Sequence, residues 1–212
     1  MQSKGNHIIT TKAEHKAVLD TCAFLDEDGF EVTYLDVDSE GLISSEMLNK
    51  VLRPDTILVS ILYANNETGT IQPLDEISRL THKNGSLLFS DTTQALGKVD
   101  LSKVFQLVDF ACFSAHKVYG PKGIGLVFIK DNEDGNGLPS LIQGGGQQKN
   151  QRGGTLNTPL IIGFSKAIEL AHDNLNTEIQ RLETLRNKLE KGLLKIDLSI
   201  SNSAPPRRLS NT

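Results

Sequence analysis

The chain has 212 residues, of which 38% are hydrophobic and 23% are charged, and its formal net charge is −4. This composition is typical of a globular protein, and the small negative charge argues against a broad basic surface for nucleic acid. No apolar run is long enough to cross a bilayer, and the first residues lack the layout of a signal peptide. We therefore expect neither nucleic acid nor a membrane among its direct partners.

The chain contains two cysteines, Cys22 and Cys112, which are too few for a disulfide framework or a cysteine-based metal cluster. Cys22 falls within a helical pattern and Cys112 within an apolar strand pattern. Both are therefore expected to be small buried hydrophobic side chains rather than nucleophiles. We expect no metal site and a reducing, cytosol-like compartment.

Strand and helix patterns alternate along the chain. In chain order the sequence predicts a strand at 7–11, a helix at 14–28, a strand at 31–35, a short helix from Ser44 or Ser45 to Val51, a strand at 56–62, a helix at 73–83, strands at 87–90, 108–113 and 125–129, a polar loop at 131–137, and helix at 159–194 with a break near Asn174 or Asn176. This alternation indicates an α/β domain with a mostly parallel sheet covered by helices on both faces.

Both ends of the chain resemble cut ends. The strand at 7–11 has no earlier element to pack against, and residues 203–208 read as a polar linker that leads to nothing. We therefore expect a fragment of a longer protein.

Polar side chains follow four of the predicted strands, and ligands of α/β sheets bind at the carboxyl ends of strands. The strand-end residues are His15, Asn66, Asp91, Gln94, Ser114, His116 and Lys117. Each has an ordinary explanation when taken alone: Asn66 can serve its own turn, Asp91 can cap the next turn, and His15 can be a surface residue. Their joint placement at strand ends predicts a binding site.

Lys117 follows the apolar run at 108–113 and precedes a turn at 120–123 that contains Gly and Pro. We expect it to be partly buried at the edge of the sheet. Burial disfavours the ammonium form, so such a lysine can lose its proton and attack a carbonyl carbon, which is the chemistry of a Schiff-base lysine. An ordinary surface lysine is the alternative.

The remaining strand-end residues suit an aldehyde cofactor that contains a pyridine ring. Such a cofactor needs a carboxylate at the ring nitrogen, which Asp91 can supply, and a flat group over the ring, which His15 can offer. The phenolic oxygen and the phosphate need polar partners, for which Asn66, Gln94, Ser114 and His116 are suited.

A glycine-rich stretch at 144–155 is a second candidate for anion binding. Its glycines allow the backbone to approach a ligand closely, and Arg152 and Thr155 are residue types that bind anions. A flexible surface loop explains the glycines equally well.

These motifs together resemble the cysteine desulfurases, which are pyridoxal 5'-phosphate (PLP) enzymes of aminotransferase class V. The resemblance covers residues 7 to about 211 and is carried, in the order of the family, by the segments at 7–18, 65–69, 91–94, 114–123 and 144–159. It implies the PLP-dependent transferase fold of type I. It further implies that residues 1–165 form a PLP-binding large domain, incomplete at its N-terminus, and that residues 166–212 form a long helix and the start of a small domain.

The resemblance also implies a role for each site residue. Lys117 would hold PLP as a Schiff base and then move the substrate α-proton, with His15 stacked on the ring and assisting. Asp91 would pair with the pyridine nitrogen and Gln94 with the phenolic oxygen. The other implied contacts are Asn66 with that oxygen and the substrate, Arg152 with the substrate, Ser114 and His116 with the phosphate, and Thr155 with the phosphate in the partner subunit of a homodimer.

The implied reaction of the full-length protein converts L-cysteine to L-alanine and leaves persulfide sulfur on the enzyme. The acceptor would be an iron–sulfur scaffold protein or a tRNA thiolation partner, and the location cytoplasmic or, in a eukaryote, the mitochondrial matrix. Neither Cys22 nor Cys112 matches the sulfur-accepting cysteine of the family, so we expect this chain alone to be inactive. Two alternatives stay open: a selenocysteine lyase or other class V enzyme, and a non-catalytic fragment that binds PLP or only dimerises.

Overall fold

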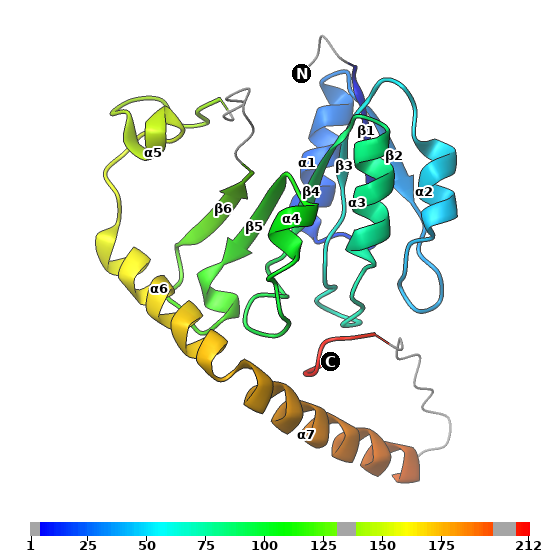
Figure 1. Cartoon of the computed structure of the whole chain (residues 1–212), viewed down its shortest axis with the longest axis vertical. Helices are drawn as coiled ribbons and strands as arrows, with labels where there is room; N and C mark the ends of the chain where they lie inside the picture. Colours follow the sequence, from blue (N-terminus) through cyan, green and yellow to red (C-terminus); the bar gives the residue numbers. More distant parts are fainter. Residues whose placement is uncertain (1–4, 131–138, 197–206) are drawn as a thin grey trace.

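The computed structural model describes residues 5–130, 139–196 and 207–212, and shows a six-stranded sheet with the strand order β2-β1-β3-β4-β5-β6 (Figure 1). The strands are β1 (His7–Thr11), β2 (Glu31–Leu35), β3 (Thr56–Ser60), β4 (Leu87–Asp91), β5 (Phe110–Ser114) and β6 (Gly125–Ile129). All pairings are parallel except that of β5 with β6. The predicted mostly parallel sheet is therefore confirmed.

The predicted strands differ from the observed ones at their ends. The strand predicted at 56–62 ends at Ser60, because the amide of Leu62 donates to the carboxylate of Glu14. The strand predicted at 108–113 begins two residues later, at Phe110, because Val108 is the C-cap of the short helix α4 (Val104–Leu107). This helix was not predicted from the sequence. The predicted polar loop at 131–137 lies outside the described residues.

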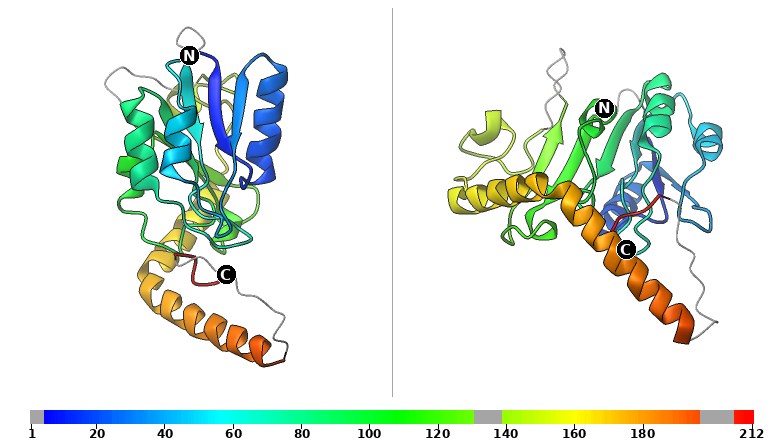
Figure 2. Two further views of the ribbon diagram at one scale, coloured as in Figure 1. Left: turned by 90° about the vertical axis from the view of Figure 1, so that its right-hand side faces the viewer. Right: turned by 60° about the horizontal axis from the view of Figure 1, so that its bottom comes forward.

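Helices cover both faces of the sheet, as predicted. Figure 2 shows α1 (Lys16–Glu27) on one face, and α2 (Ser45–Val51), α3 (Leu74–Lys83) and α4 on the other. Ser44 caps α2 by accepting a hydrogen bond from the amide of Met47, which decides between the two predicted caps.

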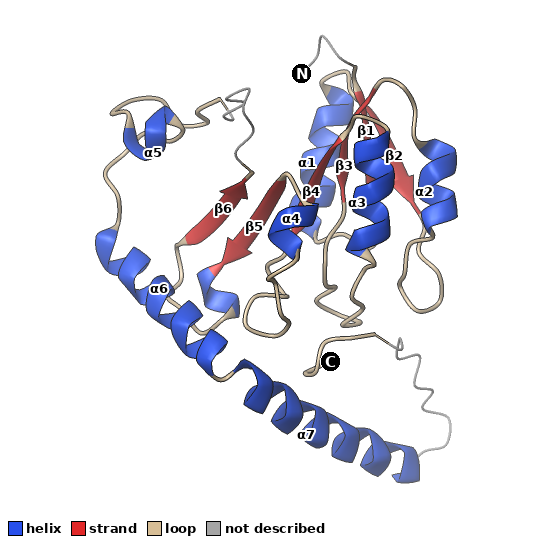
Figure 3. Cartoon of the chain, in the orientation of Figure 1, coloured by secondary structure: helices blue, strands red, loops and turns tan. Residues whose placement is uncertain are grey.

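Two long helices, α6 (Thr158–Asp173) and α7 (Leu175–Ile196), follow the sheet and cross below it (Figure 3). The predicted break lies at Asn174, whose side chain donates to the carbonyl of Leu170. The predicted domain boundary at 165/166 falls inside α6 and stays a prediction. In the described part of the chain, no helix combines the length and apolar character that a membrane span requires.

The hydrophobic core lies between the parallel strands and the helices α2, α3 and α4. Ile9, Val59 and Leu88 are completely buried, whereas Leu126 and Val127 of β6 are 45% and 58% exposed. The antiparallel strand is thus the least covered part of the sheet.

The end of the chain returns to the sheet rather than leading to nothing. The amide of Leu209, a 1% exposed residue, donates to the carbonyl of Gly69, and the amide of Ile71 donates to the carbonyl of Arg207. Arg208 forms an ion pair with Glu190 of α7 at 2.6 Å. The linker predicted at 203–208 is therefore wrong for residues 207 and 208, because a buried leucine and backbone hydrogen bonds hold residues 207–212 in place. Residues 203–206 lie outside the described residues.

Candidate active site

The predicted site residues gather where four parallel strands end. Strands β1, β3, β4 and β5 run in the same direction, so their carboxyl ends and the following loops share one edge of the sheet, which we call the carboxyl edge. His15 follows β1, Asn66 follows β3, Asp91 ends β4, and Lys117 follows β5. The structure therefore brings together four segments that are far apart in the sequence.

Asp91 is the half-buried last residue of β4 and pairs in register with Cys112 of β5. Its Oδ1 accepts a 2.9 Å hydrogen bond from the amide of Thr93. Among the described residues, its carboxylate forms no ion pair with a lysine, arginine or histidine. A partly desolvated carboxylate without a protein cation is suited to a cationic group of a ligand.

Cys22 is buried in α1, as predicted, whereas Cys112 of β5 is only half-buried. Burial raises the pKa of the Cys22 thiol, and burial together with the nearby Asp91 carboxylate raises the pKa of Cys112 to about 12. Because the thiolate is the reactive form, both thiols are held in their unreactive state at neutral pH. Neither is placed to act as a nucleophile.

Lys117 ends a short 3-10 helix (Ala115–Lys117) that begins directly after β5. Ala115 is buried and anchors this turn, since the amides of Val118 and Gly120 both donate to its carbonyl. The side chains of His116 and Lys117 are exposed, whereas Ser114 is half-buried. The expectation that Lys117 is partly buried is therefore wrong for this chain, because the turn places it at an edge that is open to solvent.

Gln94 lies in a tight turn after β4, and its Oε1 accepts a 2.6 Å hydrogen bond from Nζ of Lys98. Sequence reasoning did not select Lys98. The available signal was the four-residue spacing of a glutamine and a lysine, which places the two side chains on the same side of a helical turn.

Two adjacent asparagines after β3 have different environments. Asn65 holds the turn: its Oδ1 accepts from the amides of Glu67 and Thr68 at 2.8 and 2.9 Å, and its Nδ2 donates to the carbonyl of Ala13. Asn66 is exposed. The turn function that could have explained Asn66 thus belongs to its neighbour, and Asn66 remains a candidate ligand contact.

His15 is the N-cap of α1, and its Nδ1 accepts a 3.2 Å hydrogen bond from the amide of Ala17. In the neutral ring this bond places the proton on Nε2. The ring itself is exposed at the carboxyl edge, where it can contact a ligand.

Glu14 is a second residue that sequence reasoning missed. Its side chain is buried and its Oε1 accepts from the amide of Leu62 at 2.6 Å and from the hydroxyl of Thr11 at 3.3 Å. Burial and the nearby Asp91 carboxylate raise the pKa of Glu14 to about 8. Its signal in the sequence was the spacing Thr-x-x-Glu between a strand and a helix, which is typical of a side-chain-stabilised turn.

The glycine-rich stretch lies elsewhere. It contains the short helix α5 (Gln147–Asn150), and Figure 1 shows α5 beside β6, at the end of the sheet opposite the carboxyl edge. Arg152 and Thr155 are exposed, and Arg152 donates to the carbonyl of Gly154 at 3.3 Å. Among the described residues, neither side chain forms a hydrogen bond with another predicted site residue.

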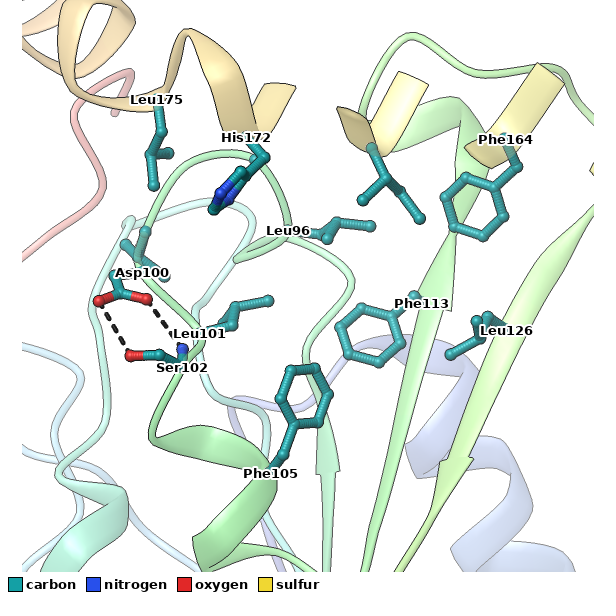
Figure 4. Close-up of a pocket in the computed structure, with 13 residues that line it drawn as sticks. Leu96, Asp100, Leu101, Ser102, Phe105, Phe113, Leu126, Phe164, His172 and Leu175 are labelled. Carbon is teal, nitrogen blue, oxygen red and sulfur yellow. Dashed lines mark hydrogen bonds between the residues drawn. The ribbon is translucent and has the colours of Figure 1, made fainter. Parts of the chain in front are cut away.

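A cavity of about 340 Å³ lies between the sheet and α6 and contains none of the predicted site residues (Figure 4). Its walls are mostly apolar and include Leu96, Phe105, Phe113 and Phe164. Its polar residues are Asp100, Ser102 and His172, and Asp100 accepts hydrogen bonds from the amide and hydroxyl of Ser102. Within the described residues, no group of metal-ligating side chains is present there or elsewhere. The chemistry-bearing groups lie at the carboxyl edge instead.

Residues 1–211 match the family model described as "Aminotransferase class-V". The chain belongs to the class V aminotransferase family. It is 46% identical over 192 residues to cysteine desulfurase IscS of Clostridium botulinum, covering 91% of this chain and 48% of the relative. It is 45% identical over 210 residues to IscS of Acinetobacter baumannii, covering 99% of this chain and 52% of the relative. The chain thus spans about half the length of the curated relatives that it matches.

Solved structures show the same similarity. A NifS-like protein superposes with a TM-score of 0.92 at 42% identity, covering 99% of this chain and 57% of that protein. DndA from Streptomyces lividans has a TM-score of 0.84 at 37% identity, covering 91% of this chain and 55% of that protein. A structure of SspA in complex with cysteine has a TM-score of 0.71 at 41% identity, covering 78% of this chain and 47% of that protein. The predicted fold and the predicted family are both confirmed.

Proposed function

We propose that this chain is the cofactor-holding part of a PLP-dependent cysteine desulfurase. The observation that carries the proposal is the convergence of His15, Asp91, Gln94 and Lys117 at one edge of the sheet. The similarity to proteins named cysteine desulfurase supports the choice of reaction, and a similar protein crystallised with cysteine supports the choice of substrate.

The residues at the carboxyl edge fit PLP. Asp91 has a half-buried carboxylate without a protein cation among the described residues, which suits a protonated pyridine nitrogen. Lys117 supplies an amine that can bond to an aldehyde, and its exposure leaves it open to the cofactor. Ser114 and His116 precede it in the sequence and would donate to the phosphate.

PLP supplies an electron sink for the bonds at the substrate α-carbon. The residues of the chain hold and move protons around it: Asp91 keeps the ring nitrogen protonated, Gln94 donates to the phenolic oxygen, and Lys117 takes the α-proton. His15 would contact the ring face, with Nε2 as its free proton donor. Asn66 and Arg152 would bind the substrate.

The sulfur-accepting step has no residue in the described part of this chain. Cys22 is buried and Cys112 has a thiol pKa of about 12, so neither provides a thiolate at neutral pH. We therefore propose that the 212-residue chain alone holds PLP but does not release sulfur from L-cysteine. Delivery of sulfur to an iron–sulfur scaffold protein belongs to the longer protein.

The proposal includes a homodimer. Arg152 and Thr155 lie between α5 and α6, in a stretch that follows none of the four strand ends, and we propose that they contribute to the site of a second copy. Thr155 would then bind the phosphate in the partner subunit. The cytoplasmic or matrix location likewise stays a prediction.

Incubation with PLP followed by gel filtration tests the proposal. We expect the wild-type chain to retain a visible absorption band, Lys117→Ala to lose it, and Lys122→Ala, a matched exposed lysine nearby, to keep it. With L-cysteine we expect no more sulfide than free PLP releases. Retention of the band by Lys117→Ala, or sulfide release by the chain, would contradict the proposal.

A further inference from the structure

Lys98 is a half-buried lysine beside the carboxyl edge, and its environment is unusual for a cation. Its ammonium donates to Oε1 of Gln94 at 2.6 Å, and among the described residues it forms no ion pair with a carboxylate. Withdrawing an ammonium from water without an anionic partner is unfavourable. A lysine at this position therefore needs a reason other than packing.

The backbone brings Lys98 toward Lys117. Residues 92–99 form a helix-like turn, in which the amide of Ala95 donates to the carbonyl of Thr92 and the amide of Val99 donates to that of Ala95. Gly97 has a φ of +72°, and a Cβ there would lie 2.7 Å from Val118, the residue after Lys117. Burial and the charge of Lys117 both lower the pKa of Lys98. The approach of Gly97 to Val118 thus places the backbone at Lys98 near the backbone at Lys117, and the charge of Lys117 disfavours the ammonium form of Lys98.

The hydrogen bond determines which way the amide of Gln94 faces. A lysine ammonium can only donate, so the atom that faces it must be the carbonyl oxygen of the amide. The NH2 group of Gln94 then points to the opposite side of the amide. In the described part of the chain no hydrogen-bond partner of that NH2 group is present, which leaves it free to donate to a ligand.

We propose that Lys98 is a positioning residue that fixes the side-chain amide of Gln94 with its NH2 group presented as a donor to an anionic oxygen of the ligand. The proposal rests on the proposed function, in which that oxygen is the phenolic oxygen of PLP. Without Lys98 the amide can turn over and present its own oxygen to the phenolic oxygen, which replaces a hydrogen bond with a repulsion.

Nuclear magnetic resonance on the ¹⁵N-labelled chain tests the first half of the proposal without any cofactor. The Gln94 NH2 signals are identified by their loss in Gln94→Ala. We expect these signals to report a rigid amide in the wild type, a mobile amide in Lys98→Met, and a rigid amide again in Lys98→Arg, which retains a donor. Lys103→Met, at an exposed lysine nearby, is the matched control and should change nothing. An unchanged Gln94 amide in Lys98→Met would overturn the proposal.

A double-mutant cycle on PLP affinity tests the second half. Losing one hydrogen bond weakens binding roughly five- to tenfold, so we expect this loss for Gln94→Ala and for Lys98→Met. The double variant should bind no more weakly than Gln94→Ala, because Lys98 acts only through Gln94. Losses that multiply would show that Lys98 contacts the ligand directly and would refute its positioning role.

The NMR experiment and the affinity cycle together distinguish a failure of this proposal from a failure of the proposed function. If the wild-type chain binds no PLP, the proposed function fails, and the amide signals alone decide whether Lys98 fixes Gln94. If PLP binds but Lys98→Met retains wild-type affinity, the proposed function stands and the role of Lys98 is refuted.

Discussion

The carboxyl edge and the region around α5 both carry predicted ligand-binding residues, yet they are built differently. At the carboxyl edge the residues follow strands whose centres are completely buried, such as Ile9, Val59 and Leu88. Around α5, Arg152 and Thr155 are exposed and lie beyond a strand, β6, whose Leu126 and Val127 are half exposed. The first region is positioned by the core of the chain, whereas we propose that the second acts in the site of another copy.

Truncating a buried side chain should destabilise the first region far more than the second. Leu88→Ala should lower the free energy of unfolding by about 2–5 kcal/mol, because it opens a cavity at a completely buried position of β4. Leu126→Ala, at the 45% exposed position in β6, should cost less than about 1 kcal/mol. Urea denaturation of both variants measures the difference, and equal losses would show that β6 belongs to the core as much as β4 does.

The second prediction concerns pH and Glu14. Burial raises the pKa of Glu14 from 4.5 to about 8, so between these values the folded state binds the proton more tightly than the unfolded state does. The stability contributed by this group is therefore complete at low pH and is lost as the pH rises toward 8, by an amount on the order of a few kcal/mol.

Glu14→Gln should remove that pH dependence, since the amide cannot ionise. Urea midpoints at about pH 5 and about pH 8 should then differ less in Glu14→Gln than in the wild type. Glu76→Gln, at an exposed position of α3, is the control and should retain the wild-type difference. If Glu14→Gln retains the wild-type change of the urea midpoint with pH, groups other than Glu14 cause that change.

The third prediction concerns the returning segment at 207–212. Gly69 has a φ of +74°, and a Cβ there would lie 2.6 Å from Cβ of Thr212. Gly85 has a similar φ of +78°, but a Cβ there would meet no atom of the described residues within 4 Å. Both Gly→Ala variants should lose roughly 1–2 kcal/mol of stability to a left-handed alanine, and only Gly69→Ala should also displace the segment.

Hydrogen exchange at the amide of Leu209, which donates to the carbonyl of Gly69 at 2.8 Å, reports that displacement. Faster exchange in Gly69→Ala than in Gly85→Ala is the expected result. Equal exchange in the two variants would mean that contacts other than the one at Gly69 hold the segment.

The fourth prediction concerns Thr155 in the region around α5. Thr155→Val should weaken PLP binding roughly fivefold when the chain is dimeric, because one hydrogen bond from the partner is lost. When the protein is diluted until sedimentation shows monomers, the variant and the wild type should bind equally. A difference that persists in the monomer would place Thr155 in the site of its own chain.

Most of the sheet could be predicted from the sequence because its strands are short apolar runs between clear turns. The site residues followed from the rule that parallel strands end at one edge, which needs only the order of the strands along the chain. The exposure of Lys117 could not be predicted, since it depends on a 3-10 turn that directs the side chain out of the sheet.

Glu14 and Lys98 were missed for a related reason. The role of Glu14 depends on the amide of Leu62, which is 48 residues away in the sequence. The role of Lys98 depends on the close approach of Gly97 to Val118. Neither contact leaves a periodic pattern in the sequence. The return of residues 207–212 was likewise hidden, because a single buried leucine in a polar stretch resembles a linker.

Borohydride reduction of the PLP-treated chain, followed by peptide mass mapping, tests most directly whether Lys117 holds the cofactor. The reagent converts a reversible bond between a lysine and the cofactor aldehyde into a permanent one, so the modified residue can be identified. We expect a label on Lys117. A label on Lys98 or Lys122 in its place, or no label on any lysine, would contradict it.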